Sequence, residues 1–477
     1  MPEIFIDGRS VQAEPNQTVI EAAVANGIEM AYFCWHPKLS IAGNCRVCAI
    51  QVEGRSWVEI ACNMPVSEGL RVQTDTELVK QYRKSVMQLL TLNHPVDCGI
   101  CDKAGECKLQ DYHYAYNGAP SISVDPKLRL TKFYPLSERI VLDNERCILC
   151  SRCVRFTHEI SKSKALGIKQ RGDASVVRPA EDRSFDNDPY SDNVIDLCPV
   201  GALLSRSFFY KSRVWYLQPT KSVCPRCARG CTVQLWHRKP EWKLNALDPQ
   251  HNVSIERVTP LENPAVNGPW ICNVGRDLGP FFESPRAEQA MTKGQPVELA
   301  AAIEHARRLI ESAQRPVALL SNWGSNEELD AFERALGARF EAFYKIDRVR
   351  QPEEPVEDEL LVRDDKNPNT AALHARFAPY EGNASLDAAD LLLVWGEGFD
   401  FTRVPHGAQV ILLGAWLHPE NAQVDVFIPI SIQTERHGHY TNFEGVVSAF
   451  EPCFTKKATV AHAETLFVAL AAVPVNA

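Results

Sequence analysis

The chain has 477 residues, which is enough for about three domains of ordinary size. Apolar residues make up 45% of the chain and charged residues 23%, and this balance excludes a disordered or collagen-like protein. The net charge of −9 gives no support to binding through bulk positive charge, so no nucleic-acid partner is expected.

No stretch of the sequence predicts a membrane span or a targeting segment. The longest apolar runs, such as Leu391–Trp395 and Leu466–Val475, are shorter than the roughly 18 residues that a span needs. The first residues have neither a basic start with an apolar core nor the Arg- and Ser-rich character of a transit peptide. We therefore expect a soluble, cytoplasmic chain with no direct membrane span.

The cysteines are the most informative residues. There are 16, and all but one lie at or before Cys272. Without a secretory signal a disulfide framework is not expected, because a reducing cytosol keeps thiols free. Thiols at such short intervals would be prone to oxidation unless something occupied them. We therefore expect them to bind metal, and their spacing indicates which metal.

The first group of cysteines predicts a two-iron centre. Strands are expected on both sides of Asp7-Gly8, and Thr18–Glu21 is a capping box that opens a helix ended by Gly27. Further strands are expected over residues 47–52, 57–61 and 70–74. This plan resembles that of plant-type [2Fe–2S] ferredoxins, although ten residues separate the first two ligands. A structural zinc site is the alternative. The expected ligands are Cys34, Cys45, Cys48 and Cys62.

A second group follows a helix predicted over residues 75–92. The apolar residues of that helix recur at helical spacing and mark its expected buried face: Leu78, Tyr82, Val86, Leu89 and Leu90. Three thiolates can bind three irons of a cubane, and His94 is within reach of the fourth corner. A neutral imidazole would make such a cluster less negative and alter its potential. A zinc site is again the alternative. The predicted [4Fe–4S] ligands are His94, Cys98, Cys101 and Cys107.

The third group has the spacing C-x2-C-x2-C followed at a distance by Cys-Pro. This is the bacterial ferredoxin pattern for a [4Fe–4S] cluster, whereas zinc sites usually take their ligands in pairs. Arg146 and Arg152 flank the thiolates and could moderate a negatively charged cluster, but we expect both on the solvated surface. The ligands are Cys147, Cys150, Cys153 and Cys198.

The fourth group has the spacing C-x2-C-x3-C with a distant fourth cysteine. Pro225 and Gly230 keep its loop irregular, as a backbone that wraps a cluster must be. A third [4Fe–4S] cluster is therefore predicted, with ligands Cys224, Cys227, Cys231 and Cys272. Only Cys453 is left over, and we expect a plain thiol there.

Four complete sets of four ligands along one chain indicate a relay of electrons, since a structural metal would need only one site. No residue is expected to do acid–base or nucleophilic chemistry, and there is no G-x-G-x-x-G after a predicted strand. The residues alone therefore predict an electron-transfer protein with one [2Fe–2S] cluster and three [4Fe–4S] clusters.

These motifs, in this order, resemble the large iron–sulfur subunit family of respiratory complex I, whose bacterial members are the G subunits of NADH-quinone oxidoreductase. The resemblance covers residues 1 to 285. It implies that the first three clusters lie on or beside the relay from flavin to quinone and that the fourth lies off the main line. The matching stretches are Tyr32–Pro37, Gly43–Cys48, Asn93–Cys98, Gly105–Asp111, Arg146–Arg155 and Cys198–Ala202.

The resemblance implies a multidomain chain of α+β and α/β class. Residues 1–78 are expected to form a [2Fe–2S] ferredoxin-like (β-grasp) domain and residues 79–215 a domain with two [4Fe–4S] clusters. Residues 216–285 correspond to a [4Fe–4S] domain of the molybdopterin-oxidoreductase type. Residues 286–477 would then be a truncated α/β domain of that type, without its cofactor.

The pattern of residues 286–477 predicts alternating strands and helices around a parallel sheet. Strands are expected at Pro316–Ser321, Leu391–Trp395, Val410–Leu413 and Val424–Pro429, and helices at Ser325–Leu336 and Ala458–Ala472. Residues 347–385, rich in charge and proline, are expected to form a long loop.

Two late motifs bear on the cofactor of this part of the chain. The stretches at residues 434–438 and 440–445 resemble a motif of molybdenum-type domains, but Val446 stands where an arginine is common. Cys453 lies too near the end for a metal ligand of such an enzyme. We therefore expect a scaffold without molybdenum.

By this resemblance the chain is a subunit of a proton-translocating NADH:quinone oxidoreductase and has no catalytic site of its own. Its implied partners are a flavin- and NADH-binding subunit with its small [2Fe–2S] partner, and the hydrophilic and ferredoxin-like subunits on the quinone side. It would lie in the cytoplasmic peripheral arm of a complex attached to the inner membrane. The alternatives are the alpha subunit of an NAD-linked formate dehydrogenase, the diaphorase-side subunit of an NAD-reducing hydrogenase, and a zinc-stabilised scaffold.

Overall fold

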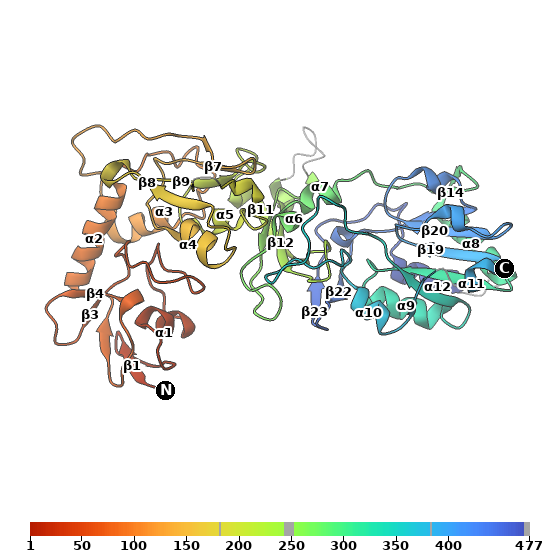
Figure 1. Ribbon diagram of the computed structural model, residues 1–477, viewed down its shortest axis with the longest axis horizontal. Helices are drawn as coiled ribbons and strands as arrows, with labels where there is room; N and C mark the ends of the chain where they lie inside the picture. The colour runs from red at the N-terminus through yellow and green to blue at the C-terminus, as the bar shows by residue number, and fades with distance from the viewer. Residues whose placement is uncertain (181–182, 243–251, 382–383, 472–477) are drawn as a thin grey trace. The chain divides into compact units, whose positions relative to one another are not determined.

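The structure is a computed structural model that describes residues 1–180, 183–242, 252–381 and 384–471 (Figure 1). The chain divides into two compact units, Met1–Tyr216 and Leu217–Ala477. Across the described ranges, no helix combines the length and the apolar composition needed to cross a membrane.

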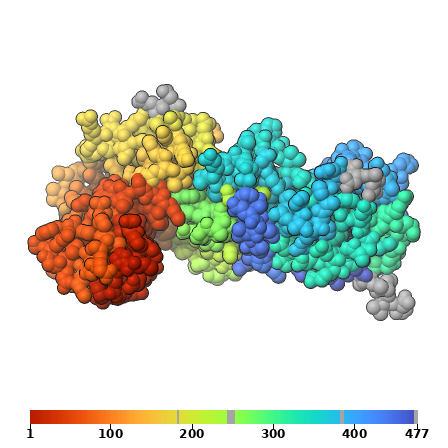
Figure 2. Space-filling model, turned by 60° about the horizontal axis from the view of Figure 1, so that its bottom comes forward, coloured from red at the N-terminus to blue at the C-terminus, as the bar shows by residue number. Residues whose placement is uncertain are grey.

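The first unit begins with a small sheet that one helix covers. Its strands follow the order β2-β1-β5-β3-β4, with β1 parallel to β5 and the other neighbours antiparallel. Their bounds are β1 Glu3–Ile6, β2 Arg9–Gln12, β3 Ala49–Val52, β4 Val58–Ile60 and β5 Arg71–Gln73. Helix α1 (Val19–Ala25) starts at the predicted capping box, and Gly27 has a positive φ of 70° just after it. This part forms one lobe, red in Figure 2.

Helix α2 (Glu77–Thr91) buries a different face from the predicted one. Val79, Arg83 and Met87 are buried, whereas Leu78 and Leu89 are exposed. The reason is Arg83, whose guanidinium donates hydrogen bonds to the carbonyls of residues 47 and 49 at 3.3 and 3.0 Å. A charged residue therefore sits at the centre of the packed face, and hydrophobic periodicity does not detect it.

The rest of the first unit consists of short elements joined by long loops. Its helices are α3 (Lys108–Tyr112), a π-helical turn (His113–Asn117), α4 (Arg152–Glu159) and α5 (Asn193–Leu197). Its strands are β6 (Tyr134–Pro135), β7 (Ile140–Leu142), β8 (Leu166–Lys169), β9 (Val176–Pro179) and β10 (Leu203–Ser205). Short 3-10 turns lie at Ala61–Asn63, Gly172–Ala174, Phe185–Asn187 and Val214–Tyr216. With so little regular backbone bonding, these loops depend on side chains for their shape.

The second unit opens with a three-stranded antiparallel sheet, β11 (Leu217–Val223), β12 (Thr232–Arg238) and β13 (Arg257–Pro260). Helices α6 (Asn273–Arg276) and α7 (Leu278–Phe282) follow it. A hairpin of β22 (Gly438–Thr441) and β23 (Val447–Phe450) packs beside β11.

An eight-stranded sheet forms the core of the second unit, in the order β15-β14-β21-β20-β19-β16-β17-β18. The strands from β21 to β18 are parallel, which confirms the predicted parallel sheet. Their bounds are β14 Ala290–Thr292, β15 Gln295–Val297, β16 Pro316–Ser321, β17 Glu341–Lys345, β18 Ala378–Pro379, β19 Leu391–Trp395, β20 Gln409–Gly414 and β21 Val426–Pro429. Helices α8 (Leu299–Ser312), α9 (Asn326–Leu336) and α12 (Ala463–Ala471) pack together around one apolar core.

Two predicted segments of the second unit differ from the structure. Helix α12 begins at Ala463 rather than at residue 458, because Ala461 is paired in a β-bridge with Ile430. Residues 347–385 are not a plain loop, since they contain α10 (Thr370–His374) and β18 and reach into α11 (Ala384–Asp387). Strand β18 extends the sheet beside β17, so this segment adds to the core fold.

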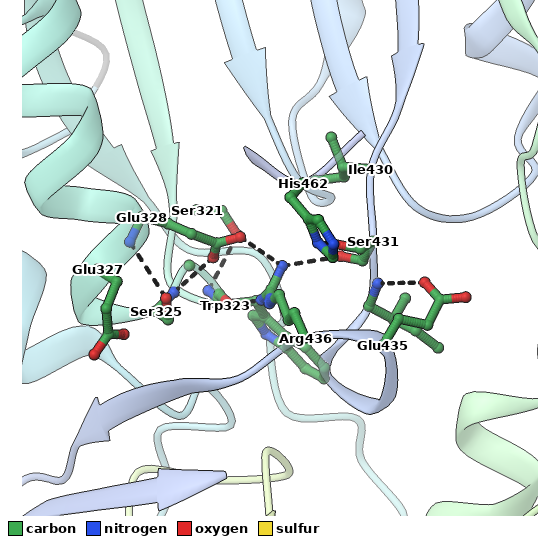
Figure 3. A network of polar contacts seen from close by, with 12 residues as sticks. Ser321, Trp323, Ser325, Glu327, Glu328, Ile430, Ser431, Glu435, Arg436 and His462 are labelled. Carbon is green, nitrogen blue, oxygen red and sulfur yellow. Dashed lines mark hydrogen bonds and ion pairs between the residues drawn. The ribbon is translucent and has the colours of Figure 1, made fainter. Parts of the chain in front are cut away.

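A buried ion pair joins α9 to the segment after β21 (Figure 3). Glu328 caps the helix by accepting from the backbone N–H of Ser325 at 2.8 Å. Its carboxylate also meets Nη1 of Arg436 at 2.8 Å, and burial raises the pKa of this carboxyl group. Arg436 donates further to the carbonyls of Ser431 and Trp323, at 2.9 and 3.0 Å. Arg436, part of the late motif, thus has an internal structural role.

Replacing Arg436 by methionine would leave Glu328 buried without its cation. We expect Arg436→Met to lower the free energy of unfolding by about 3–5 kcal/mol, the usual effect of breaking a buried pair. Urea unfolding followed by tryptophan fluorescence measures it, with Arg308→Met on the exposed side of α8 as the control. A loss no larger than that of the control would contradict the structural role.

Candidate metal centres

The four predicted ligands of the first set come together on the small sheet. Cys34 and Cys45 lie on the loop between α1 and β3, Cys48 precedes β3, and Cys62 lies in the turn after β4. All four are buried. Hydrogen bonds between the thiols join Cys34 to Cys45, Cys34 to Cys62 and Cys48 to Cys62. The bonds with Cys45 and Cys62 lower the pKa of Cys34 to about 2. The set therefore forms one compact group of sulfur atoms.

The second set is built around the loop that follows α2. Cys98, Cys101 and Cys107 are electrostatic neighbours, and burial raises the pKa values of Cys101 and Cys107. His94 shares the charged neighbours Asp97 and Arg146 with this loop. Its Nδ1 atom is buried without a hydrogen-bond partner, and burial lowers the pKa of the ring to about 4. A neutral, unpaired imidazole nitrogen fits the role of a metal ligand.

The third set lines a single cavity. Cys147, Cys150, Cys153 and Cys198 all face it, and burial raises the pKa of Cys147 to about 12 and that of Cys150 to about 11. Leu149 has a positive φ of 50°, and its backbone N–H donates to Sγ of Cys147 at 3.4 Å. A left-handed backbone at a residue other than glycine is costly, which is typical of a functional loop.

The fourth set also lines one cavity. Cys224 follows β11, Cys231 precedes β12, and Cys272 lies at the start of α6. The backbone N–H of Cys224 donates to the carbonyl of Cys231 at 2.8 Å, which closes the loop that also bears Cys227. Burial raises the pKa of Cys272 to about 11 and also raises those of Cys224 and Cys231.

The thiols whose pKa values are raised by burial favour the protonated state when nothing compensates their charge. A thiolate is the form that binds metal, so loading the sites that contain them would release protons and supply positive charge. Within the described parts of the chain, no three His, Cys, Asp or Glu side chains converge on a point suited to a single metal ion. Cys453 is partly buried, and burial raises its pKa to about 12.

Arg146 and Arg152 are buried, which corrects the expectation of a solvated surface. Their relative exposures are 1% and 5%. Arg152 donates to the carbonyl of Leu197 at 3.1 Å and also to that of Trp35, so it joins the third set to the first loop. A sequence pattern places arginine at the surface by default. These two are stabilised by backbone carbonyls and carboxylates that come together only in the fold.

Helix α4 connects the third set to the first set. Arg155 donates from Nη2 to the carbonyls of Cys34 and Cys150, at 2.5 and 3.3 Å, so one guanidinium bridges a ligand residue of each set. At the end of the helix, Glu159 accepts from the backbone N–H of Ser40 at 2.7 Å. These contacts fix the third set beside the first.

The chain after Cys198 connects the third set to the second set. The backbone N–H of Lys108 donates to the carbonyl of Pro199 at 3.2 Å. Gly201 packs directly against Cys101, because a Cβ atom at Gly201 would lie 2.1 Å from the Sγ of Cys101. The third set therefore contacts the loops of both other sets in the first unit.

The second unit also contains a cavity of about 170 Å³ at the carboxyl ends of its parallel strands. Trp323, Trp395 and Trp416 contribute to its wall. Both arginines that line it are paired internally, Arg436 with Glu328 and Arg348 with Glu354.

The packing at Gly201 predicts a selective defect. In Gly201→Ala the new methyl group would collide with Cys101, so we expect loss of the second cluster and of about four irons per chain. Iron analysis and EPR of the reduced protein measure this. Gly167→Ala in β8 is the control, since no atom lies within 4 Å of a Cβ there. An unchanged second-cluster signal in Gly201→Ala would contradict this account.

Three family models match the first unit. Residues 2–77 match a 2Fe-2S iron-sulfur cluster binding domain, and residues 83–119 match the NADH-ubiquinone oxidoreductase-G iron-sulfur binding region. Residues 137–204 match the ferredoxin-like domain of NADH-quinone oxidoreductase subunit 3. These ranges contain the first, second and third ligand sets in turn, and the fourth set lies beyond them.

Curated relatives match over more than half of the chain. The G subunit of NADH-quinone oxidoreductase from Rickettsia typhi is 35% identical over 276 residues, which are 58% of this chain and 39% of the relative. The mitochondrial NADH dehydrogenase [ubiquinone] iron-sulfur protein 1 of Solanum tuberosum is 35% identical over 294 residues, 61% of this chain and 38% of the relative. The alpha subunit of NADPH-Fe(3+) oxidoreductase from Geobacter sulfurreducens is 34% identical over 298 residues, 62% of this chain and 33% of the relative.

The chain thus spans under two-fifths of the length of these relatives. The matches confirm the expected resemblance and the multidomain α/β description with iron–sulfur domains. The first unit of the chain therefore contains domains that match iron–sulfur cluster-binding models, and this part of the chain is similar to the G subunits of NADH-quinone oxidoreductase.

Proposed function

We propose that the chain is an electron-relay subunit of an NADH:quinone oxidoreductase of the complex I type. The single observation that carries this proposal is the position of the third ligand set, which contacts the loops of the first and second sets through Arg155 and Gly201. Ligand sets in contact through shared residues suit stepwise transfer. Relatives named as NADH-quinone oxidoreductase subunits support the donor and the acceptor.

The proposed ligands follow the four sets. Cys34, Cys45, Cys48 and Cys62 hold a [2Fe–2S] cluster, and His94 with Cys98, Cys101 and Cys107 holds a [4Fe–4S] cluster. Two further [4Fe–4S] clusters are assigned to Cys147, Cys150, Cys153 and Cys198 and to Cys224, Cys227, Cys231 and Cys272. Most of these thiols are buried, and among them only Cys98 is exposed. Their burial, the unpaired Nδ1 of His94 and the two cysteine-lined cavities support these assignments.

Electrons would pass from the first set to the third and then to the second, although the third comes last of these in the chain. The clusters supply the one-electron chemistry when they are bound. The protein contributes ligands, spacing and insulation from water. One guanidinium, that of Arg155, donates to the backbone carbonyls of Cys34 and Cys150. This fixes the distance between the first and third sets, across which the first electron transfer would occur.

We also propose partner subunits on both sides of the electron relay. A flavin- and NADH-binding subunit with its small [2Fe–2S] partner would supply electrons, and hydrophilic and ferredoxin-like subunits would receive them on the quinone side. The chain would then lie in the cytoplasmic peripheral arm of a membrane-attached complex.

We propose four domains, over residues 1–78, 79–215, 216–285 and 286–477. We assign the last of these a scaffolding role without molybdenum. The arginines of its cavity support this role, because their charges are paired with Glu328 and Glu354 and are not directed at an anionic cofactor.

The function is tested in the complex purified anaerobically through this chain. Reduction with NADH should produce the EPR signals of its clusters, and a quinone should remove them. Formate and hydrogen should leave them oxidised, and molybdenum should be absent. Reduction by formate with stoichiometric molybdenum would instead indicate a formate dehydrogenase, and reduction by hydrogen a hydrogenase. Reoxidation by ferric iron but not by quinone would indicate that ferric iron is the electron acceptor, as the name of the Geobacter relative states for that protein.

The role of His94 has its own test. In His94→Cys a thiolate would replace the neutral ring, so we expect a [4Fe–4S] cluster with a more negative charge and a lower potential. EPR-monitored redox titration measures it, with His158→Cys on α4, outside the four ligand sets, as the control. An unchanged spectrum and potential in His94→Cys would show that His94 is not a ligand.

A further inference from the structure

Arg146 is next to the third set in the sequence, but its side chain contacts the loop that bears the second set. It directly precedes Cys147, a ligand of the third set. Its Nε and Nη2 atoms donate to Oδ2 of Asp97 at 3.3 and 3.0 Å, and Asp97 directly precedes Cys98 of the second set. The guanidinium of Arg146 therefore packs against the loop that bears the second set.

The same side chain lies close to Cys101. A Cβ atom built on Gly201 would be 3.7 Å from Cδ of Arg146 and 2.1 Å from Sγ of Cys101. The side chain of Arg146 and the thiol of Cys101 therefore both pack against Gly201. Cys101 is also the ligand against which the third set packs, so Arg146 lies where the two sets meet.

One donor of this guanidinium remains free inside the protein. The Nη1 atom of Arg146 is buried and has no hydrogen-bond partner, while the residue as a whole is 1% exposed. A buried donor left unpaired costs about 1–3 kcal/mol, and more when it is charged. The cost would be removed if Nη1 had an acceptor that belongs to the second site.

The charges around Arg146 define what its removal would do. Asp143 lies 3.2 Å from its Nε, and Lys132 meets Asp97, Asp143 and Glu145. Arg129 also lies 3.6 Å from Glu145, so three carboxylates share three cations at the second site. Loss of Arg146 would leave one more carboxylate than cations there, which disfavours the arrival of an electron.

We propose that Nη1 of Arg146 donates a hydrogen bond to a sulfur atom of the second cluster and thereby raises its reduction potential. This inference rests on the proposed function, because it requires a [4Fe–4S] cluster on His94, Cys98, Cys101 and Cys107. Reduction adds one negative charge to the cluster, and a cation with a directed N–H stabilises that charge. Arg146 is thus a positioning and tuning residue, and it favours movement of the electron from the third set to the second.

The test is an EPR-monitored redox titration of the full chain, purified anaerobically. At the wild-type midpoint of the second cluster, Arg146→Met should lower the ratio of reduced to oxidised cluster about tenfold, which is about 59 mV for one electron. Arg146→Lys keeps the charge but loses Nη1, so a smaller fall in the same direction is expected. Arg152→Lys, at the other buried arginine of the third set, should leave the second cluster unchanged.

Iron content distinguishes a failure of the proposed function from a failure of this inference alone. A second cluster that is absent from the wild-type chain would overturn the proposed function, whereas a cluster that is present but keeps its potential in Arg146→Lys would overturn this inference alone. If Arg146→Met fails to assemble, Arg146→Met with Asp143→Asn restores the local charge balance. That double variant should still titrate below wild type, because it also lacks Nη1, and a wild-type potential would contradict the hydrogen bond.

Discussion

A thiolate taken out of water is costly unless a positive charge stays close to it, and this constraint governs the part of the chain that binds clusters. Burial raises the pKa values of Cys101, Cys107, Cys147 and Cys150 in the first unit. The loops that bear them must nevertheless hold their ligands ready for iron, which requires deprotonated sulfur. The protein meets this demand with cations that it buries in the same loops.

Arginine side chains replace regular backbone bonding where the ligand loops meet. Arg152 and Arg155 on α4 donate to carbonyls of the first ligand loop, and Arg146 binds the loop of the second set. A guanidinium offers several donors in a fixed plane, so it can join two segments that have no strand or helix in common. The same groups place positive charge beside the sulfur ligands. Structure and tuning of potential are therefore carried by the same residues.

Local signals in the sequence were sufficient for much of the fold. The capping boxes at Thr18 and Ser325 open α1 and α9 as predicted, because a cap depends only on residues within one turn. The buried strands Pro316–Ser321 and Leu391–Trp395 have the predicted limits, since continuous apolar runs are characteristic of parallel sheets. That the cysteines would lie together in groups was likewise predictable, because each group contains thiols separated by only two or three residues.

Features that depend on distant partners could not be predicted in this way. The buried face of α2 centres on Arg83, whose partners are the carbonyls of residues 47 and 49 on another element. Burial of Arg146 depends on Asp97, 49 positions earlier in the chain. The spatial order of the ligand sets also differs from their order in the sequence, because α4 and the segment at Gly201 contact loops far away in the chain.

The content of iron and acid-labile sulfide in the anaerobically purified chain tests the central claim most directly, because every ligand assignment contributes to one number. Four filled sites predict about 14 irons per chain, a matching amount of sulfide, and neither zinc nor molybdenum. About four zinc ions per chain without sulfide would contradict the relay altogether.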